Sequence, residues 1–173
     1  MSVKVTGEGL AGIFEAIQVL TQHEVLIGIP HGETRSDADM TNAQLGYLHE
    51  SGSPAMNLPA RPFLVPGVEA VNDLTAKQLT KAAEAGLKGN LAGVNRFLHI
   101  AGMTAQNSVR RYITTAAFTP LSQATINARL RAGKTRTKPL IDTGQLRNSI
   151  TYVIRKKGGI DAISRCIGCA SGS

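Results

Sequence analysis

The longest patterned stretch of the chain is residues 67–118, which read GVEAVNDLTAKQLTKAAEAGLKGNLAGVNRFLHIAGMTAQNSVRRYITTAAF. Apolar residues recur through it at helical spacing, among alanines and polar residues, and this predicts a long helix. Glycines interrupt the pattern at Gly86, Gly89, Gly93 and Gly102, and each costs about 1 kcal/mol relative to alanine inside a helix. We therefore expect a break or kink between residues 86 and 93. The alternative is that the spaced glycines mark close helix packing in an assembly.

Shorter patterns precede this stretch. Residues 8–21 carry one apolar stripe at helical offsets, which predicts a first helix. Residues 24–30, EVLIGIP, are β-branched and apolar and end in a proline, as is typical of a buried strand. Thr41 can cap a short helix that ends at residues 51–54. The alternation of residues 3–6 is compatible with one more short strand.

Four prolines fall between the short helix and the long one, at Pro54, Pro59, Pro62 and Pro66. Proline fixes its own φ and removes a backbone donor. We therefore predict an extended arm over residues 53–66, without regular helix, that loses little entropy when it becomes ordered.

The C-terminal third carries three further signals. Residues 119–122, TPLS, predict a helix with Pro120 in its first turn. Asp142 and Gln145 have the spacing of a capping box, which predicts a short helix turn. Residues 150–154 alternate and precede Gly-Gly, so a hairpin running to residue 169 is the natural prediction. At 173 residues the chain fits one domain, residues 1–173, with a buried core.

The formal charge of +7 is confined to one segment. Residues 129–157 hold nine basic side chains against Asp142 alone, whereas residues 1–128 are close to neutral. A basic loop at about 131–140 lies within this segment. Such a field suits phosphate backbones or an acidic protein surface; the alternative is a solvated, mobile linker. Aromatic residues make up 4% and Trp is absent, which disfavours base-specific reading of single strands.

Signals for chemistry are missing. Cys166 and Cys169 form a lone C-x-x-C, whereas a zinc site needs four ligands. The four histidines are scattered, and no nucleophile elbow or phosphate loop occurs. We therefore predict no catalytic, cofactor or metal site and no enzyme. The longest apolar run, residues 25–29, is far short of the roughly 20 that span a membrane. With no secretory signal visible, we expect a protein made in the cytoplasm, without a membrane partner.

Two blocks of sequence resemble a known group of proteins. The first comprises VLIGIP at 25–30, NAQLGYLHESGS at 42–53 and LPARPFL at 58–64; the second comprises PLSQATI at 120–126 and KPLIDTGQLRNSI at 138–150. In this order they resemble the neck and tail-completion proteins of long-tailed double-stranded DNA phages. The resemblance is to the lambda minor tail protein Z group and the Mu-like virion morphogenesis group.

The resemblance implies an α+β subunit with a small antiparallel sheet packed against a long helix and an extended proline-rich arm. It implies a structural virion protein that assembles in the bacterial host cytoplasm and completes the tail and joins it to the DNA-filled head. By the same resemblance, the protein is expected to form a ring of its own copies, a hexamer. The other expected partners are neck proteins on the portal or adaptor side, tail tube or terminator proteins, and double-stranded DNA in the channel, contacted non-specifically. The alternative is a basic DNA-binding protein that acts in packaging or regulation.

Two sets of residues become candidates for contacts. The first set lies in the arm, and we expect it to anchor in a neighbouring subunit. It comprises Arg61, Pro62, Phe63 and Leu64. The alternative is that these residues cover the core of their own subunit. The second set is basic, and we expect it to line the DNA channel or to dock on acidic portal or tail surfaces. It comprises Arg129, Arg131, Lys134, Arg136, Lys138, Arg155, Lys156 and Lys157. Asp142 and Gln145 are expected to have only the structural role of a helix cap.

Overall fold

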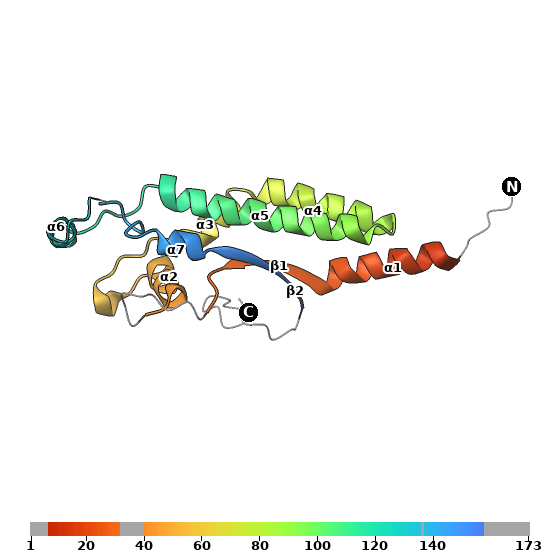
Figure 1. The fold of residues 1–173 in the computed structure, drawn as a ribbon, viewed down its shortest axis with the longest axis horizontal. Helices are drawn as coiled ribbons and strands as arrows, with labels where there is room; N and C mark the ends of the chain where they lie inside the picture. The colour runs from red at the N-terminus through yellow and green to blue at the C-terminus, as the bar shows by residue number, and fades with distance from the viewer. Residues whose placement is uncertain (1–6, 32–39, 136, 158–173) are drawn as a thin grey trace. The chain divides into compact units, whose positions relative to one another are not determined.

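A computed structural model of the chain describes residues 7–31, 40–135 and 137–157 (Figure 1). The elements in chain order are α1 (Gly7–Gln22), β1 (His23–Gly28), α2 (Asn42–Ser51), the 3₁₀ turn η1 (Pro54–Met56), α3 (Leu64–Glu69), α4 (Asn72–Leu87), α5 (Leu91–Thr115), α6 (Gln123–Arg131), α7 (Gln145–Ser149) and β2 (Thr151–Lys156). Strands β1 and β2 pair as a two-stranded antiparallel sheet. The predicted α+β class, with a small sheet on a long helix, is confirmed.

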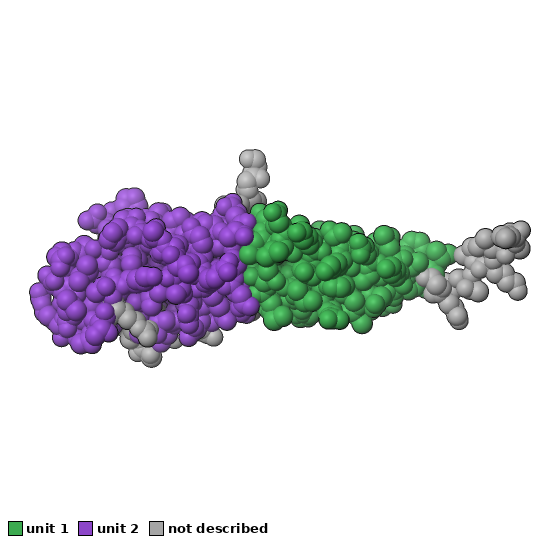
Figure 2. Space-filling view, turned by 90° about the horizontal axis from the view of Figure 1, so that it is seen from above, with its two compact units in different colours: residues 1–27, 71–105, 152–159 green, residues 28–70, 106–151, 160–173 purple. Residues whose placement is uncertain are grey.

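The chain divides into two compact units, coloured separately in Figure 2. Unit one comprises residues 1–27, 71–105 and 152–159, and unit two comprises residues 28–70, 106–151 and 160–173. The continuous helix α5 contributes residues to both units. The assignment of residues 1–173 to one domain stays a prediction.

The core of unit one is formed by small and branched side chains from three helices. Its buried members are Ala16, Ala85, Val94 and Leu98, and half-buried apolar residues of α1 and both strands pack against them. Alanines at the contact let helices α1 and α4 approach closely, because no larger side chain separates them. On the sheet side, Tyr152 of β2 lies against Gly102 of α5, where a Cβ atom would overlap its ring.

The predicted break in the long helix is confirmed. Helix α4 ends at Leu87 and α5 begins at Leu91. Between them Gly89 has φ +68°, a left-handed conformation that glycine adopts without steric cost. Its N–H donates to the Gly86 carbonyl at 2.9 Å, which satisfies one of the exposed ends of α4.

The core of unit two gathers residues from α3, α5, α7 and the segments between them. Its largest fully buried side chains are Phe63, Ile113, Ile150 and Val109. Two glycines make room for this packing. An ideal Cβ on Gly67 of α3 would lie 2.8 Å from the Val109 Cα, and one on Gly46 of α2 would lie 2.6 Å from Ile29 Cδ1.

The description of residues 53–66 as wholly non-helical is wrong. Pro54 begins the 3₁₀ turn η1, and α3 begins at Leu64 and includes Pro66. Both prolines occupy the first turn of their element, where the missing N–H has no helical acceptor to lose. Ser53 and the stretch between these two elements lack helix.

Two predicted helix starts also need correction. Asp142 and Gln145 do not form a cap: α7 begins at Gln145, and its cap residue is Gly144, which has φ +86° and no side chain to accept a bond. Asp142 instead binds the Lys134 ammonium at 2.8 Å. Pro120 is not in a first turn, because α6 begins at Gln123 and Ser122 caps it.

Other predictions are confirmed or fall outside the described residues. Helix α1 and strand β1 form where residues 8–21 and 24–30 predicted a helix and a strand, although β1 ends at Gly28. The predicted burial of the strand is wrong, because every residue of β1 is half-buried in the two-stranded sheet. Thr41 caps α2, with a reciprocal bond from Gln44. Residues 3–6, 160–169 and Arg136 lie outside the described residues.

Candidate functional site

The carboxylate of Glu50, near the end of α2, binds the start of α3. Its Oε2 accepts from the backbone N–H groups of Phe63 at 2.8 Å and Leu64 at 2.9 Å, and its Oε1 accepts from Val65 at 3.2 Å. The first N–H groups of a helix have no intrahelical acceptor, and the helix dipole favours a negative charge there. Glu50 therefore caps α3 from another helix, in place of the side-chain cap that Phe63 cannot provide.

Replacing Glu50 by glutamine tests this cap. We expect the free energy of unfolding to fall by about 1–3 kcal/mol, because bonds from backbone N–H groups to an ionised acceptor become bonds to a neutral one. Urea unfolding followed by circular dichroism measures the change. Glu69→Gln, at an exposed glutamate, is the matched control and should change stability by less than about 0.5 kcal/mol. Equal losses in both variants would contradict the role of Glu50.

Arg61, which lies two residues before Phe63 in the LPARPFL stretch, binds a distant segment of the chain. It is 4% exposed, and it donates from Nε to the Thr119 carbonyl at 2.8 Å and from Nη2 to the Pro120 carbonyl at 3.1 Å. Its backbone N–H donates to the His49 carbonyl at 2.7 Å. Burial lowers the pKa of the Arg61 guanidinium, and the positive charge of Arg129 lowers it further.

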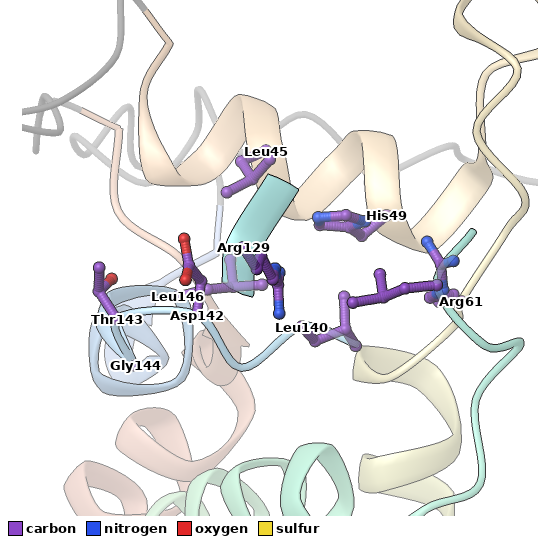
Figure 3. Close-up of a pocket in the computed structure, with 10 residues that line it drawn as sticks. Leu45, His49, Arg61, Arg129, Leu140, Asp142, Thr143, Gly144 and Leu146 are labelled. Atoms are coloured by element: carbon purple, nitrogen blue, oxygen red, sulfur yellow. The ribbon is translucent and has the colours of Figure 1, made fainter. Parts of the chain in front are cut away.

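These two arginines line a pocket of about 210 Å³ within unit two (Figure 3). Figure 3 shows Arg129 near the middle, Arg61 towards one end, and Asp142 with Thr143 towards the other. The pocket is lined by Leu45, His49, Arg61, Leu121, Arg129, Leu140, Asp142, Thr143, Gly144 and Leu146. Its lining residues come from α2, α6 and α7 and from the segments that precede α3, α6 and α7.

One residue that lines this pocket has an unfavourable backbone conformation. Leu140 is buried and has φ +61°, which a branched side chain rarely adopts. Such conformations cost about 1–3 kcal/mol and gather at binding sites, where the surrounding structure holds them. The strained Leu140 is therefore the reason for choosing this pocket as the candidate functional site.

The structure corrects the assignment of the arm residues. Phe63 is 1% exposed and Arg61 is 4% exposed, and both pack inside their own unit. These two residues therefore cover the core of their own subunit, which was the alternative. The prediction that Phe63 anchors in a neighbouring subunit is wrong. Pro62 is exposed and Leu64 is half-buried, and their contact with a neighbour stays a prediction.

The basic residues are distributed over both units. Arg129, Arg131, Lys134 and Lys138 belong to unit two, and Arg155, Lys156 and Lys157 belong to unit one. Most of them bind within their own unit. Arg129 donates to the carbonyls of Lys138 and Ile141, Lys138 donates to that of Thr114, Lys134 pairs with Asp142, and Arg155 pairs with Glu24 at 2.7 Å. Arg131, Lys156 and Lys157 are exposed.

Sequence patterns missed the roles of Glu50 and Arg61, because both side chains bind residues remote in the chain. One available signal was the start of α3, which has no Ser, Thr, Asp or Asn to cap it and so needs an acceptor from elsewhere. Leu140 carried no signal, since leucine is unexpected at positive φ.

Metal-ligand clusters and membrane-spanning helices were the other features to look for in the described part of the chain. Within residues 7–31, 40–135 and 137–157, no three His, Cys, Asp or Glu side chains are placed to hold a metal ion. No described helix is long and apolar enough to cross a membrane. Cys166 and Cys169 lie outside the described residues.

The chain matches no protein-family model, no curated protein and no solved structure.

Proposed function

We propose that this protein is a structural component of the neck of a long-tailed phage, where a ring of its copies completes the tail and joins it to the DNA-filled head. The proposal begins from the sequence resemblance at residues 25–64 and 120–150. It assigns the protein no catalytic reaction. Its partners are copies of itself and the neck and tail proteins on either side.

The observation that carries the proposal is that the resembling stretches, remote in the chain, contact one another in unit two. Glu50 of the NAQLGYLHESGS stretch binds the backbone of the LPARPFL stretch. Arg61 of that second stretch binds the carbonyls at the start of PLSQATI. Leu146 of the KPLIDTGQLRNSI stretch lies next to Gly46 of the NAQLGYLHESGS stretch. The pattern therefore describes one packed structural unit rather than separate short matches.

Unit one offers surface for subunit contacts. Large apolar side chains that remain exposed on α1 and α4 are Leu10, Phe14, Leu74, Leu79 and Leu87. Exposed apolar groups of this size favour association, because covering them removes apolar area from water. In a ring, each subunit can cover the exposed apolar side chains of its neighbour. Such a ring forms when a heterologous contact between subunits closes on itself.

The alternative of a DNA-binding protein has weaker support. Arg129, Lys134 and Lys138 all bind carbonyl or carboxylate groups of their own unit. Arg155 is likewise paired with Glu24. Fewer cations are left to neutralise phosphates, and the salt dependence of duplex binding should be shallow. A steep loss of duplex affinity with salt would favour the alternative.

The test is electron microscopy of lysates from a phage that carries a stop codon early in this gene. We expect DNA-filled heads beside separate tails, because the joining step needs the protein. Tail lengths in the same images show whether it also ends tube growth. Normally joined particles would contradict the proposal.

A further inference from the structure

Two positive side chains share the pocket of unit two. Arg61 and Arg129 both line it, and Arg61 is almost fully buried. Among the described residues Arg61 has no ion-pair partner, and its recorded bonds go to neutral carbonyls. Like charges in a partly buried site repel, and an anion placed beside them removes this cost. The pocket therefore favours an anionic group near Arg61 and Arg129.

The opposite end of the pocket offers an acceptor. Asp142 Oδ2 binds the Lys134 ammonium at 2.8 Å, whereas Oδ1 is buried and has no hydrogen-bond partner in the described part of the chain. A buried acceptor without a donor is costly, so an N–H group brought in by a ligand would be stabilised there. The Asp142 carboxylate repels every anion in the pocket, and it repels a doubly charged one such as phosphate more strongly than a single carboxylate.

Four leucines lie among the remaining lining residues, together with His49, Thr143 and Gly144, and the space is small. The four leucines are Leu45, Leu121, Leu140 and Leu146. Its volume of about 210 Å³ is below the roughly 300–1,000 Å³ of pockets that take drug-sized molecules. A single amino-acid residue fits this size better than a nucleotide or cofactor. Leu140 holds its strained φ of +61° at this wall.

We propose that this pocket binds the C-terminal carboxylate of a partner polypeptide whose last residue is apolar. Arg61 and Arg129 face the carboxylate, Asp142 Oδ1 accepts the N–H of that last residue, and the leucines contact its side chain. The three features match the three groups of a chain terminus, which a glutamate side chain or a phosphate does not combine. The inference does not depend on the proposed function, because it concerns the isolated protein.

The first experiment compares ligands on the unaltered, full-length protein by isothermal titration calorimetry. The probe is N-acetyl-alanyl-leucine, and its matched control is the same dipeptide with a C-terminal amide. We expect the acid to bind at least tenfold more tightly than the amide, because only the acid forms charge-assisted bonds with guanidinium. Equal affinities, or no binding of the acid, would overturn the proposal. If glutarate or inorganic phosphate binds as tightly as the acid, the pocket takes a different anion and the proposed recognition of a chain terminus is overturned.

The second experiment locates the site with variants. Arg129→Gln should weaken binding of the acid at least tenfold, whereas Arg131→Gln, two residues away on α6 and outside the pocket lining, should leave it unchanged. Thermal unfolding shows whether each variant keeps the fold. Unchanged binding in a folded Arg129→Gln protein would contradict the assignment. If that variant fails to fold, the comparison of acid and amide on the unaltered protein still decides the proposal.

Discussion

The Phe63→Ala variant is expected to lose about 3–5 kcal/mol of unfolding free energy, the largest effect of any single change considered. Phe63 is 1% exposed and is the largest fully buried side chain of the described residues. Its ring lies near Gly46 of α2, at the start of α3. Truncation removes the buried ring and leaves a cavity that a packed core fills only in part.

Guanidinium chloride unfolding monitored by circular dichroism measures this loss. The matched control is Phe14→Ala in α1, because Phe14 is 68% exposed. We expect the control to change stability by no more than about 0.5 kcal/mol. A loss below about 1 kcal/mol in Phe63→Ala would mean that the ring is not in the core, and the arm would again be free to anchor elsewhere.

The Gly67→Ala variant is expected to lose about 3 kcal/mol, at the upper end for an overpacked core. The added Cβ would lie 2.8 Å from the Val109 Cα and 3.0 Å from its Cγ2. The nearer obstacle is backbone of α5, which cannot rotate away as a side chain can. Helix α3 must therefore move off α5, and Phe63 at its start moves with it.

Gly12→Ala is the control for this prediction. Gly12 is also helical, but its added Cβ would meet the nearest atom, Gly89 O, at 3.8 Å, an ordinary contact. Alanine should there stabilise the helix by up to about 1 kcal/mol. Thermal unfolding of both variants gives shifts of opposite sign if the packing is as described. A stabilised Gly67→Ala protein would contradict the contact between α3 and α5.

Local signals in the sequence were sufficient for most elements. The break at Gly89 follows from the cost of glycine in a helix, and the cap at Thr41 follows from a residue pair three positions apart. The strand at residues 23–28 follows from its β-branched composition. Each of these features depends on neighbours within a few residues.

The candidate site could not be predicted in this way, because its contacts are remote in sequence. Glu50 meets the N–H groups of residues 63–65, and Arg61 meets carbonyls more than fifty positions further along. Asp142 had the spacing of a cap, but Gly144 is the cap residue of α7 and the Asp142 carboxylate binds Lys134 instead. Periodicity carries no information about such tertiary pairs.

The most direct test of the proposed neck function is reconstitution of joining in a lysate that lacks this protein. Lysate from the phage with the early stop codon is mixed with purified protein, and infectious particles are counted. We expect the unaltered protein to restore joined, infectious particles and the Phe63→Ala protein to restore fewer, in proportion to its folded fraction. If folded, unaltered protein restores none while the lysate still contains filled heads and complete tails, the account is contradicted.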